Sequence, residues 1–193
     1  MKKDSKRIVS YTTILLILII TIITKWIYPL EHAAYTVIHS IAMTFRLYNY
    51  LPIISYIFSP IHTLILICVM LAGLFIYRKK YFLFYTVFSV SSIIIGTILK
   101  YIVQRPRPSD LIDGFSFPSL HTLTLFVAVF VFLSIYNKPI VKWVAAILII
   151  SMMCSRVFLH AHYFSDTCAS LIIVHLVYLL IKNNWSRFFA NIK

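Results

Sequence analysis

The residues from Ser155 to Asp166 place an arginine, two histidines and an aspartate close together in a chain that is otherwise mostly apolar. His162 and Asp166 are four residues apart, so on a helix they would share one face. A carboxylate beside an imidazole fixes the tautomer of the ring and favours its charged form. This pairing suits a histidine that acts as a nucleophile.

Two further polar clusters precede this segment. The first contains Lys100, Arg105 and Arg107, and a proline after Arg105 predicts that the preceding apolar helix ends there. The second is Pro118–His121, in which Ser119 stands just before an apolar run and is expected to cap a helix. A helix N-terminus offers unpaired amides and a positive dipole end, both of which favour an anion.

The combined chemistry of these clusters indicates a phosphate ester as the substrate. Lys100, Arg107 and Arg156 supply positive charge, and an arginine fork can bond two phosphate oxygens at once. Asp and Glu number only five in the whole chain, so a magnesium or calcium site built from several carboxylates is not expected. We therefore expect no metal and no cofactor, and cationic side chains in place of a metal.

The composition predicts the setting in which these residues work. The chain has 193 residues, of which 61% are hydrophobic and 12% charged, and its mean hydropathy is +0.92. Soluble domains are about 45–50% apolar and about 25% charged, so an all-α polytopic membrane protein is expected, with residues 1–193 as one domain. The net charge of +13 is spread in short clusters between apolar runs, which argues against a nucleic-acid partner. Three cysteines without a spacing pattern predict neither disulfides nor a zinc site.

Six apolar runs predict six transmembrane helices. The last two runs are shorter than the minimum of about 17 residues, so flanking residues, including motif residues, must extend them. The first run follows several basic residues but lacks a signal-peptidase site, and we expect it to be a retained helix. The runs are approximately Ile8–Thr24, Ile53–Tyr77, Tyr81–Leu99, Ser119–Tyr136, Ile140–Cys154 and Thr167–Ile181.

The basic residues between the runs predict the orientation. With both termini in the cytoplasm, including a short basic tail at 183–193, 12 of the 18 Lys and Arg residues lie inside, and all three polar clusters lie at the outer face. In the segment 31–51, apolar residues recur at intervals of three or four residues, which predicts an interfacial helix. It serves either as a cover for the outer ends of the spans, which we favour, or as a ledge for a lipid substrate. The inner residues are Lys2, Lys3, Lys6, Arg7, Arg78, Lys79, Lys80, Lys138, Lys142, Lys182, Arg187 and Lys193.

The three clusters resemble the three-part signature of the type 2 phosphatidic acid phosphatase family, which shares its site with vanadium haloperoxidases. The matching patterns are Lys100-x6-Arg107-Pro108, Pro118-Ser119-x-His121 and Ser155-Arg156-x5-His162-x3-Asp166. The motifs cover residues 100–166, and six spans extend the resemblance to the whole chain. In one departure, Leu120 stands where the family has glycine. As the first residue of a right-handed helix Leu120 could still offer its amide, whereas a left-handed backbone would cost about 1–2 kcal/mol.

The resemblance implies a role for each motif residue. His162 attacks phosphorus to form a phosphohistidine, and Asp166 holds its imidazole in the correct tautomer. His121 protonates the leaving oxygen and then activates water. Arg105 and His160 lie outside the signature as possible substrate contacts. The residues implied in phosphate binding are Lys100, Arg107, Ser119, Leu120 and Arg156.

The expected substrate is a lipid phosphate or diphosphate in a bacterial cell membrane. An outer site suits undecaprenyl diphosphate first, and otherwise phosphatidylglycerophosphate or phosphatidic acid. Two alternatives stay open. One is a non-catalytic lipid-phosphate binder or transporter with the same fold, which only Leu120 favours. The other is a vanadate-dependent oxidase, against which the membrane spans argue. The oligomeric state has no signature in the sequence.

Overall fold

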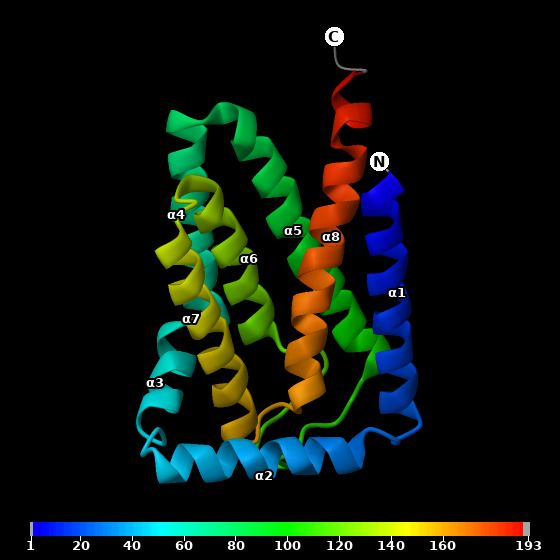
Figure 1. The fold of residues 1–193 in the computed structure, drawn as a ribbon, viewed down its shortest axis with the longest axis vertical. Helices are drawn as coiled ribbons and strands as arrows, with labels where there is room; N and C mark the ends of the chain where they lie inside the picture. Colours follow the sequence, from blue (N-terminus) through cyan, green and yellow to red (C-terminus); the bar gives the residue numbers. More distant parts are fainter. Residues whose placement is uncertain (1, 191–193) are drawn as a thin grey trace.

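The computed structural model describes residues 2–190, and throughout this part of the chain the regular structure is α-helical. Most of the helices run along a common direction, and α2 lies across one end of them (Figure 1). The all-α prediction is thus confirmed. The helices are α1 (Lys2–Ile23), α2 (Tyr28–Thr44), α3 (Tyr50–Ile57), α4 (Pro60–Tyr77), α5 (Lys79–Val103), α6 (Leu120–Ile135), α7 (Pro139–Phe158) and α8 (Phe164–Ala190).

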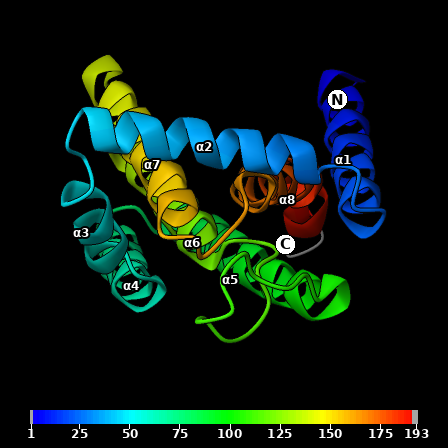
Figure 2. The same ribbon diagram turned by 90° about the horizontal axis from the view of Figure 1, so that it is seen from below.

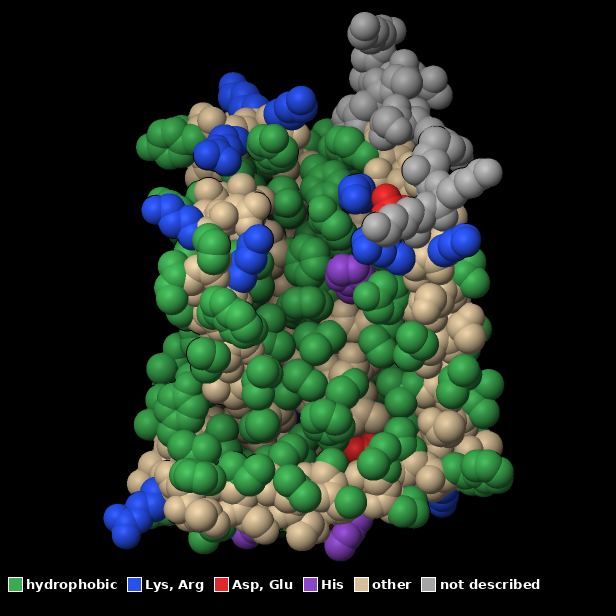
Figure 3. Space-filling view, in the orientation of Figure 1, with side chains coloured by type: hydrophobic (Ala, Val, Ile, Leu, Met, Phe, Trp, Pro, Cys, Tyr) green, Lys and Arg blue, Asp and Glu red, His purple; other side chains and the backbone are tan. Residues whose placement is uncertain are grey.

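Five helices of the described chain are long and apolar enough to cross a membrane. Apolar side chains cover most of the face of the bundle seen in Figure 3, and Trp143 on α7 is 70% exposed, as expected of a surface that faces lipid. The sixth predicted span, α6, has only 16 residues and contacts α4, α5, α7 and α8. A sixth crossing therefore stays a prediction. The five candidates are Asp4–Ile23, Pro60–Tyr77, Lys79–Val103, Pro139–Phe158 and Phe164–Trp185.

Three of the predicted runs differ most from the helices of the structure. The run 53–77 is broken into α3 and α4, because Pro60 occupies the first turn of α4 and Ser59 caps it by accepting a hydrogen bond from the amide of His62. The last two runs reach spanning length as α7 and α8, which incorporate Arg156 and Asp166. Motif residues therefore do continue these helices. The predicted tail begins as part of α8, and residues 191–193 lie outside the described chain.

The interfacial helix predicted within 31–51 is α2, which starts at Tyr28 and ends at Thr44. Seen from below, it crosses the ends of α7 and α8 (Figure 2), and it contacts both of them. Leu30 and Val37 are exposed, while Glu31 and Ala42 are buried. The helix thus covers one end of the bundle, which is the role that we favoured from the sequence.

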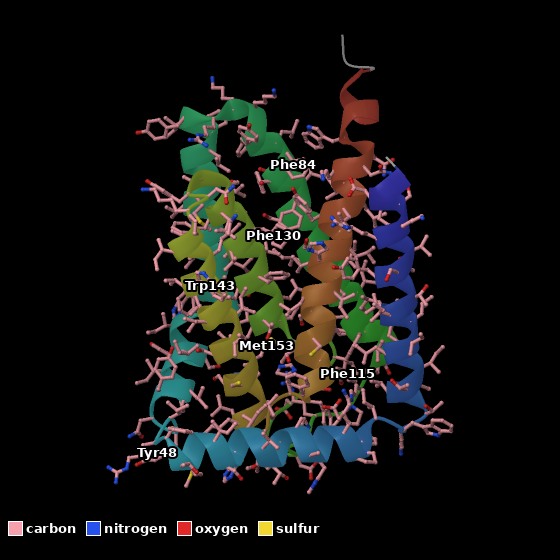
Figure 4. All side chains as sticks on the ribbon, viewed as in Figure 1. Tyr48, Phe84, Phe115, Phe130, Trp143 and Met153 are labelled. Atoms are coloured by element: carbon pink, nitrogen blue, oxygen red, sulfur yellow. The ribbon has the colours of Figure 1, made fainter. Side chains whose placement is uncertain are left out.

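The half of the bundle far from α2 is held by aromatic packing. Phe84 and Phe130 lie among α5, α6 and α8 (Figure 4), and their ring centroids are 5.8 and 5.0 Å from that of Tyr178. This core fixes the helices on which the polar residues at the opposite end are mounted.

Candidate active site

The loops 104–119 and 159–163 bring the three polar clusters together at the α2 end of the bundle (Figures 1 and 2). Helix α5 ends just after Lys100, and Gln104 adopts a left-handed conformation with a φ of 48°. The amide of Ser119 donates to the carbonyl of Asp166 at 3.2 Å, and Ser170 Oγ donates to the carbonyl of Ser119 at 2.9 Å. The second and third motifs are therefore tied directly to each other.

Two hydrogen bonds select one tautomer of His162. Its Nδ1 lies 2.7 Å from the carbonyl oxygen of Ser116, which can only accept, so Nδ1 carries the proton. Its Nε2 lies 3.2 Å from Arg107 Nη1, which can only donate, so Nε2 carries the lone pair. Arg107 Nη1 also donates to the carbonyl of Ala161 at 2.8 Å. Both contacts thus indicate an imidazole whose Nε2 is unprotonated and can attack an electrophile once Arg107 turns its hydrogen bond to the substrate.

The electrostatic environment keeps this imidazole neutral. Burial lowers the pKa of His162 to about 4; the negative charge of Asp166 opposes this shift, and the positive charges of Arg156 and Arg107 add to it. A neutral ring is required because an imidazolium has no lone pair to donate.

Asp166 acts on His162 differently from what its spacing suggested. Its Oδ2 is 3.8 Å from His162 Nδ1, beyond a normal hydrogen bond. Its oxygens instead accept from Arg105 Nη1 at 2.7 Å and from the amide of Tyr163 at 2.9 Å. The prediction that Asp166 fixes the tautomer is therefore revised: the carbonyl of Ser116 makes the direct bond, and Asp166 contributes a nearby negative charge.

Cationic side chains converge around His121. Its ring lies within electrostatic range of Lys100, Arg107, Arg156 and His162. Lys100 Nζ donates to the carbonyl of Phe115 at 2.7 Å, and Figure 4 shows Phe115 at the end of the bundle near α2.

The third cation, Arg156, is buried on α7. Its Nη1 donates to Ser55 Oγ on α3. Its Nε is buried and makes no hydrogen bond within the described chain. A buried donor of this kind retains the capacity to bond an anion.

Leu120 is the first residue of α6 and has right-handed backbone, since the non-glycine residues with positive φ in the described chain lie elsewhere. The strain considered for a side chain at this position does not arise. Ser119 makes no side-chain cap to the helix, which leaves the first amides of α6 available to an anion.

We expect Leu120→Gly to keep kcat/KM within about threefold, because the amide does not need glycine here, and to lower the free energy of unfolding by up to about 1 kcal/mol. Phosphate release and thermal unfolding in detergent check both. A tenfold gain in kcat/KM would instead show that the leucine side chain obstructs the substrate.

The structure corrects the expectation for Arg105. This side chain is 2% exposed and is paired with two carboxylates, Asp166 at 2.7 Å and Glu31 at 3.2 Å. It therefore has no surface to offer a substrate. His160 is exposed, with its ring 4.5 Å from that of Tyr35, and lines a cavity of about 280 Å³ together with His162. It stays a candidate substrate contact.

Three participants were missed in the sequence: the carbonyl of Ser116, the hydroxyl of Ser55 and the carboxylate of Glu31. A backbone carbonyl has no side-chain signature, and Ser55 is an ordinary residue of an apolar run. Glu31 did carry a signal, since it is one of only five acidic residues and lies in a largely apolar segment. Within residues 2–190, no group of three or more His, Cys, Asp or Glu side chains is placed to hold a metal ion.

The fold and the site together define a membrane-embedded phosphoric ester hydrolase that acts on lipids. The chain belongs to the PAP2 superfamily, whose profile matches residues 79–189. It is similar to the first transmembrane PAP2 type phosphatidylglycerolphosphate phosphatase from Bacillus subtilis, with 26% identity, a TM-score of 0.75, and coverage of 96% of this chain and 97% of that one. Its fold also matches LpxE from Aquifex aeolicus, with 20% identity, a TM-score of 0.64, and coverage of 80% and 95%. Comparison with curated proteins gave no match.

Proposed function

We propose that the protein hydrolyses a phosphate ester or diphosphate of a membrane lipid, without a metal, through a phosphohistidine on His162. The observation that carries this proposal is the tautomer of His162: Nδ1–H bonded to Ser116 and an Nε2 lone pair beside Arg107. This tautomer directs the lone pair of His162 toward Arg107, one of the cations expected to hold a phosphate, as attack on phosphorus requires.

In the first half-reaction, Nε2 of His162 forms a bond to phosphorus while the bond from phosphorus to the lipid oxygen breaks. His121 gives its proton to the departing oxygen. The charge on the transferring group is balanced by Lys100, Arg107 and Arg156 and by the first amides of α6. The ring becomes positive as it is phosphorylated, and the carboxylate of Asp166 stabilises that charge.

In the second half-reaction, His121 takes a proton from water as the water oxygen bonds to phosphorus. The bond from phosphorus to Nε2 then breaks, and inorganic phosphate leaves. This step restores both histidines to their starting states.

The location of the site supports a lipid substrate. The cavity beside His162 lies between α2 and the α7–α8 connection, at an end of the bundle where a headgroup can enter from water and a chain from the bilayer. We place this end outside the cell, since lysine and arginine side chains gather at the opposite end (Figure 3). Undecaprenyl diphosphate is our first candidate, because an outward site suits recycling of a polyprenyl carrier. The Bacillus neighbour favours phosphatidylglycerophosphate as the second.

The decisive experiment is phosphate release from a panel of these lipids and phosphatidic acid by the purified protein with EDTA present. Hydrolysis of at least one lipid by the wild type supports the proposal, and the lipid with the highest kcat/KM is the preferred substrate. No release from any lipid would favour a binder or transporter. A reporter fused within 104–119 tests the orientation, and a cytoplasmic signal would overturn the outer location.

The lowered pKa of His162 predicts where kcat/KM falls on the acid side of its pH profile. Because the ring stays neutral until about pH 4, protonation of His162 is not expected to lower kcat/KM as the pH falls from 7 to 5, and the decline that it causes is expected near its own pKa. The ionisation of the lipid phosphate is measured by ³¹P NMR in the same micelles, and its contribution to the pH profile is subtracted first. A remaining limb centred near 6.5 would contradict the buried neutral ring.

A further inference from the structure

A buried ionic cluster connects the interfacial helix to the catalytic machinery. It consists of Glu31 from α2, Arg105 from the loop after α5, and Asp166 with Ser165 from α8. The side chains of Glu31, Arg105 and Asp166 are 4%, 1% and 0% exposed. Three charges at this depth are costly unless each is fully bonded, so the arrangement of their bonds is informative.

Arg105 is the centre of the cluster. Its Nη1 donates to Asp166 Oδ1 at 2.7 Å and to Ser165 Oγ at 2.8 Å, and its Nη2 donates to Glu31 Oε1 at 3.2 Å. The guanidinium carbon lies 3.8 Å from the ring centroid of Tyr163 and 5.6 Å from that of Tyr28. Hydrogen bonds thus hold the guanidinium in its plane, and the two tyrosine rings pack against its face.

Glu31 also holds the start of α8. Its Oε2 accepts from the amide of Ser165 at 3.3 Å, and its Oε1 accepts from the hydroxyl of the same residue. Asp166 follows Ser165 directly. The carboxylate of Glu31 therefore holds two neighbours of Asp166: Arg105, which bonds it, and Ser165, which precedes it in the chain.

The cluster also determines the net charge next to the His162 ring. An aspartate paired with an arginine alone would be neutralised, and its field at His162 would largely cancel. Glu31 bonds the same guanidinium, so the three ionised groups together keep one negative charge. Asp166, 3.8 Å from Nδ1, can then stabilise the positive charge that develops on His162 during phosphorylation.

We propose that Glu31 and Arg105 are positioning residues for phosphotransfer, which act through Asp166 on the orientation and charge environment of His162. Helix α2 is then part of the active site and not only its cover. This inference rests on the proposed phosphatase function. The residue that links α2 to the reaction is Glu31, which lies outside all three motifs.

The test compares Glu31→Gln, which keeps the shape of the side chain and removes its charge, with Asp110→Asn, which removes one charge from an exposed position in the loop 104–119. For Glu31→Gln we expect kcat to fall about 10- to 100-fold with KM within threefold, because Glu31 bonds Arg105 and Ser165 and none of the phosphate-binding cations, while the nucleophile is displaced or less stabilised. Asp110→Asn should match the wild type, and Glu31→Asp should recover part of the loss. Equal kcat for Glu31→Gln and the wild type would overturn the proposal.

A second readout is independent of turnover: the NMR titration of the His162 ring in detergent, assigned by its absence in His162→Ala. The charged or titratable groups that face this ring are Asp166 from α8, Arg156 from α7, Arg107 from the loop and His121 from α6. Loss of the Glu31 charge disfavours the imidazolium, so the midpoint should fall in Glu31→Gln and stay in place in Asp110→Asn. An unchanged midpoint would overturn the proposal even if no lipid were hydrolysed.

A further variant covers the case in which Glu31→Gln does not fold. Ser165→Ala keeps every charge and removes only the hydroxyl that Arg105 and Glu31 share. A lower kcat at unchanged KM would support the positioning role, and wild-type kinetics would contradict it. A wild type that is inactive on every lipid, but whose midpoint shifts in Glu31→Gln, would refute the phosphatase function and leave the coupling of Glu31 to His162 standing.

Discussion

Replacing His162 with alanine is expected to abolish phosphate release, by roughly 10⁴-fold or more, because the reaction loses its nucleophile. The protein should still fold and insert, since the ring's hydrogen bonds within the described chain go to Ser116 and Arg107, and its removal leaves the pairing of Asp166 with Arg105 intact. The measurement is turnover of the best lipid by purified protein, with thermal unfolding in detergent as the check on folding.

The matched control for this variant is His62→Ala, which removes an exposed histidine at the start of α4, bonded through Nδ1 to the carbonyl of Tyr56. It should retain wild-type turnover. The two variants together separate loss of the nucleophile from loss of any histidine. Near-wild-type turnover by His162→Ala would refute the phosphohistidine mechanism, whatever the family of the chain.

The parts of the site that the sequence predicts are those whose partners are close in the chain. The spacings from Lys100 to Arg107 and from Arg156 through His162 to Asp166 define two short motifs that each fold locally. The third motif contains Ser119, which marks the start of a helix. Fixed spacings of this kind predict residue types and roles. They do not predict which atoms meet.

The parts that the sequence could not predict depend on contacts between distant segments. Ser116 and His162 are 46 positions apart, Glu31 and Arg105 are 74 apart, and Ser55 and Arg156 are 101 apart. Each pair meets only because helices pack side by side or because α2 crosses the bundle. Hydrophobic periodicity predicts that these helices exist but carries no information about their neighbours.

The misassignment of Arg105 has the same cause. At the sequence level an arginine two positions from Arg107 is indistinguishable from a phosphate ligand, because both follow a helix and precede a proline. Only the position of Glu31, brought in by α2, shows that one arginine is enclosed by carboxylates while the other faces His162. The fate of a basic residue near a membrane surface thus depends on which acid the fold brings to it.

Replacing His121 with alanine is expected to have the second largest effect, about 10²- to 10⁴-fold on lipid turnover, because a poor leaving oxygen then departs without a proton. The substrate p-nitrophenyl phosphate separates the two steps, since its nitrophenolate leaves without protonation. With it, phosphorylation of His162 should still occur in the variant, whereas hydrolysis of the phosphohistidine, which needs His121 to activate water, should be slow.

The expected signature is a burst of about one nitrophenolate per enzyme followed by a slow phase, with a phosphoryl group that is acid-labile and alkali-stable. Adding His162→Ala to this variant should remove both the burst and the bound phosphate, which assigns them to that ring. A slow rate without a burst would mean that His121 is needed for attack as well as for proton transfer. A burst that persisted in the double variant would place the covalent intermediate on another residue and exclude His162 as the nucleophile.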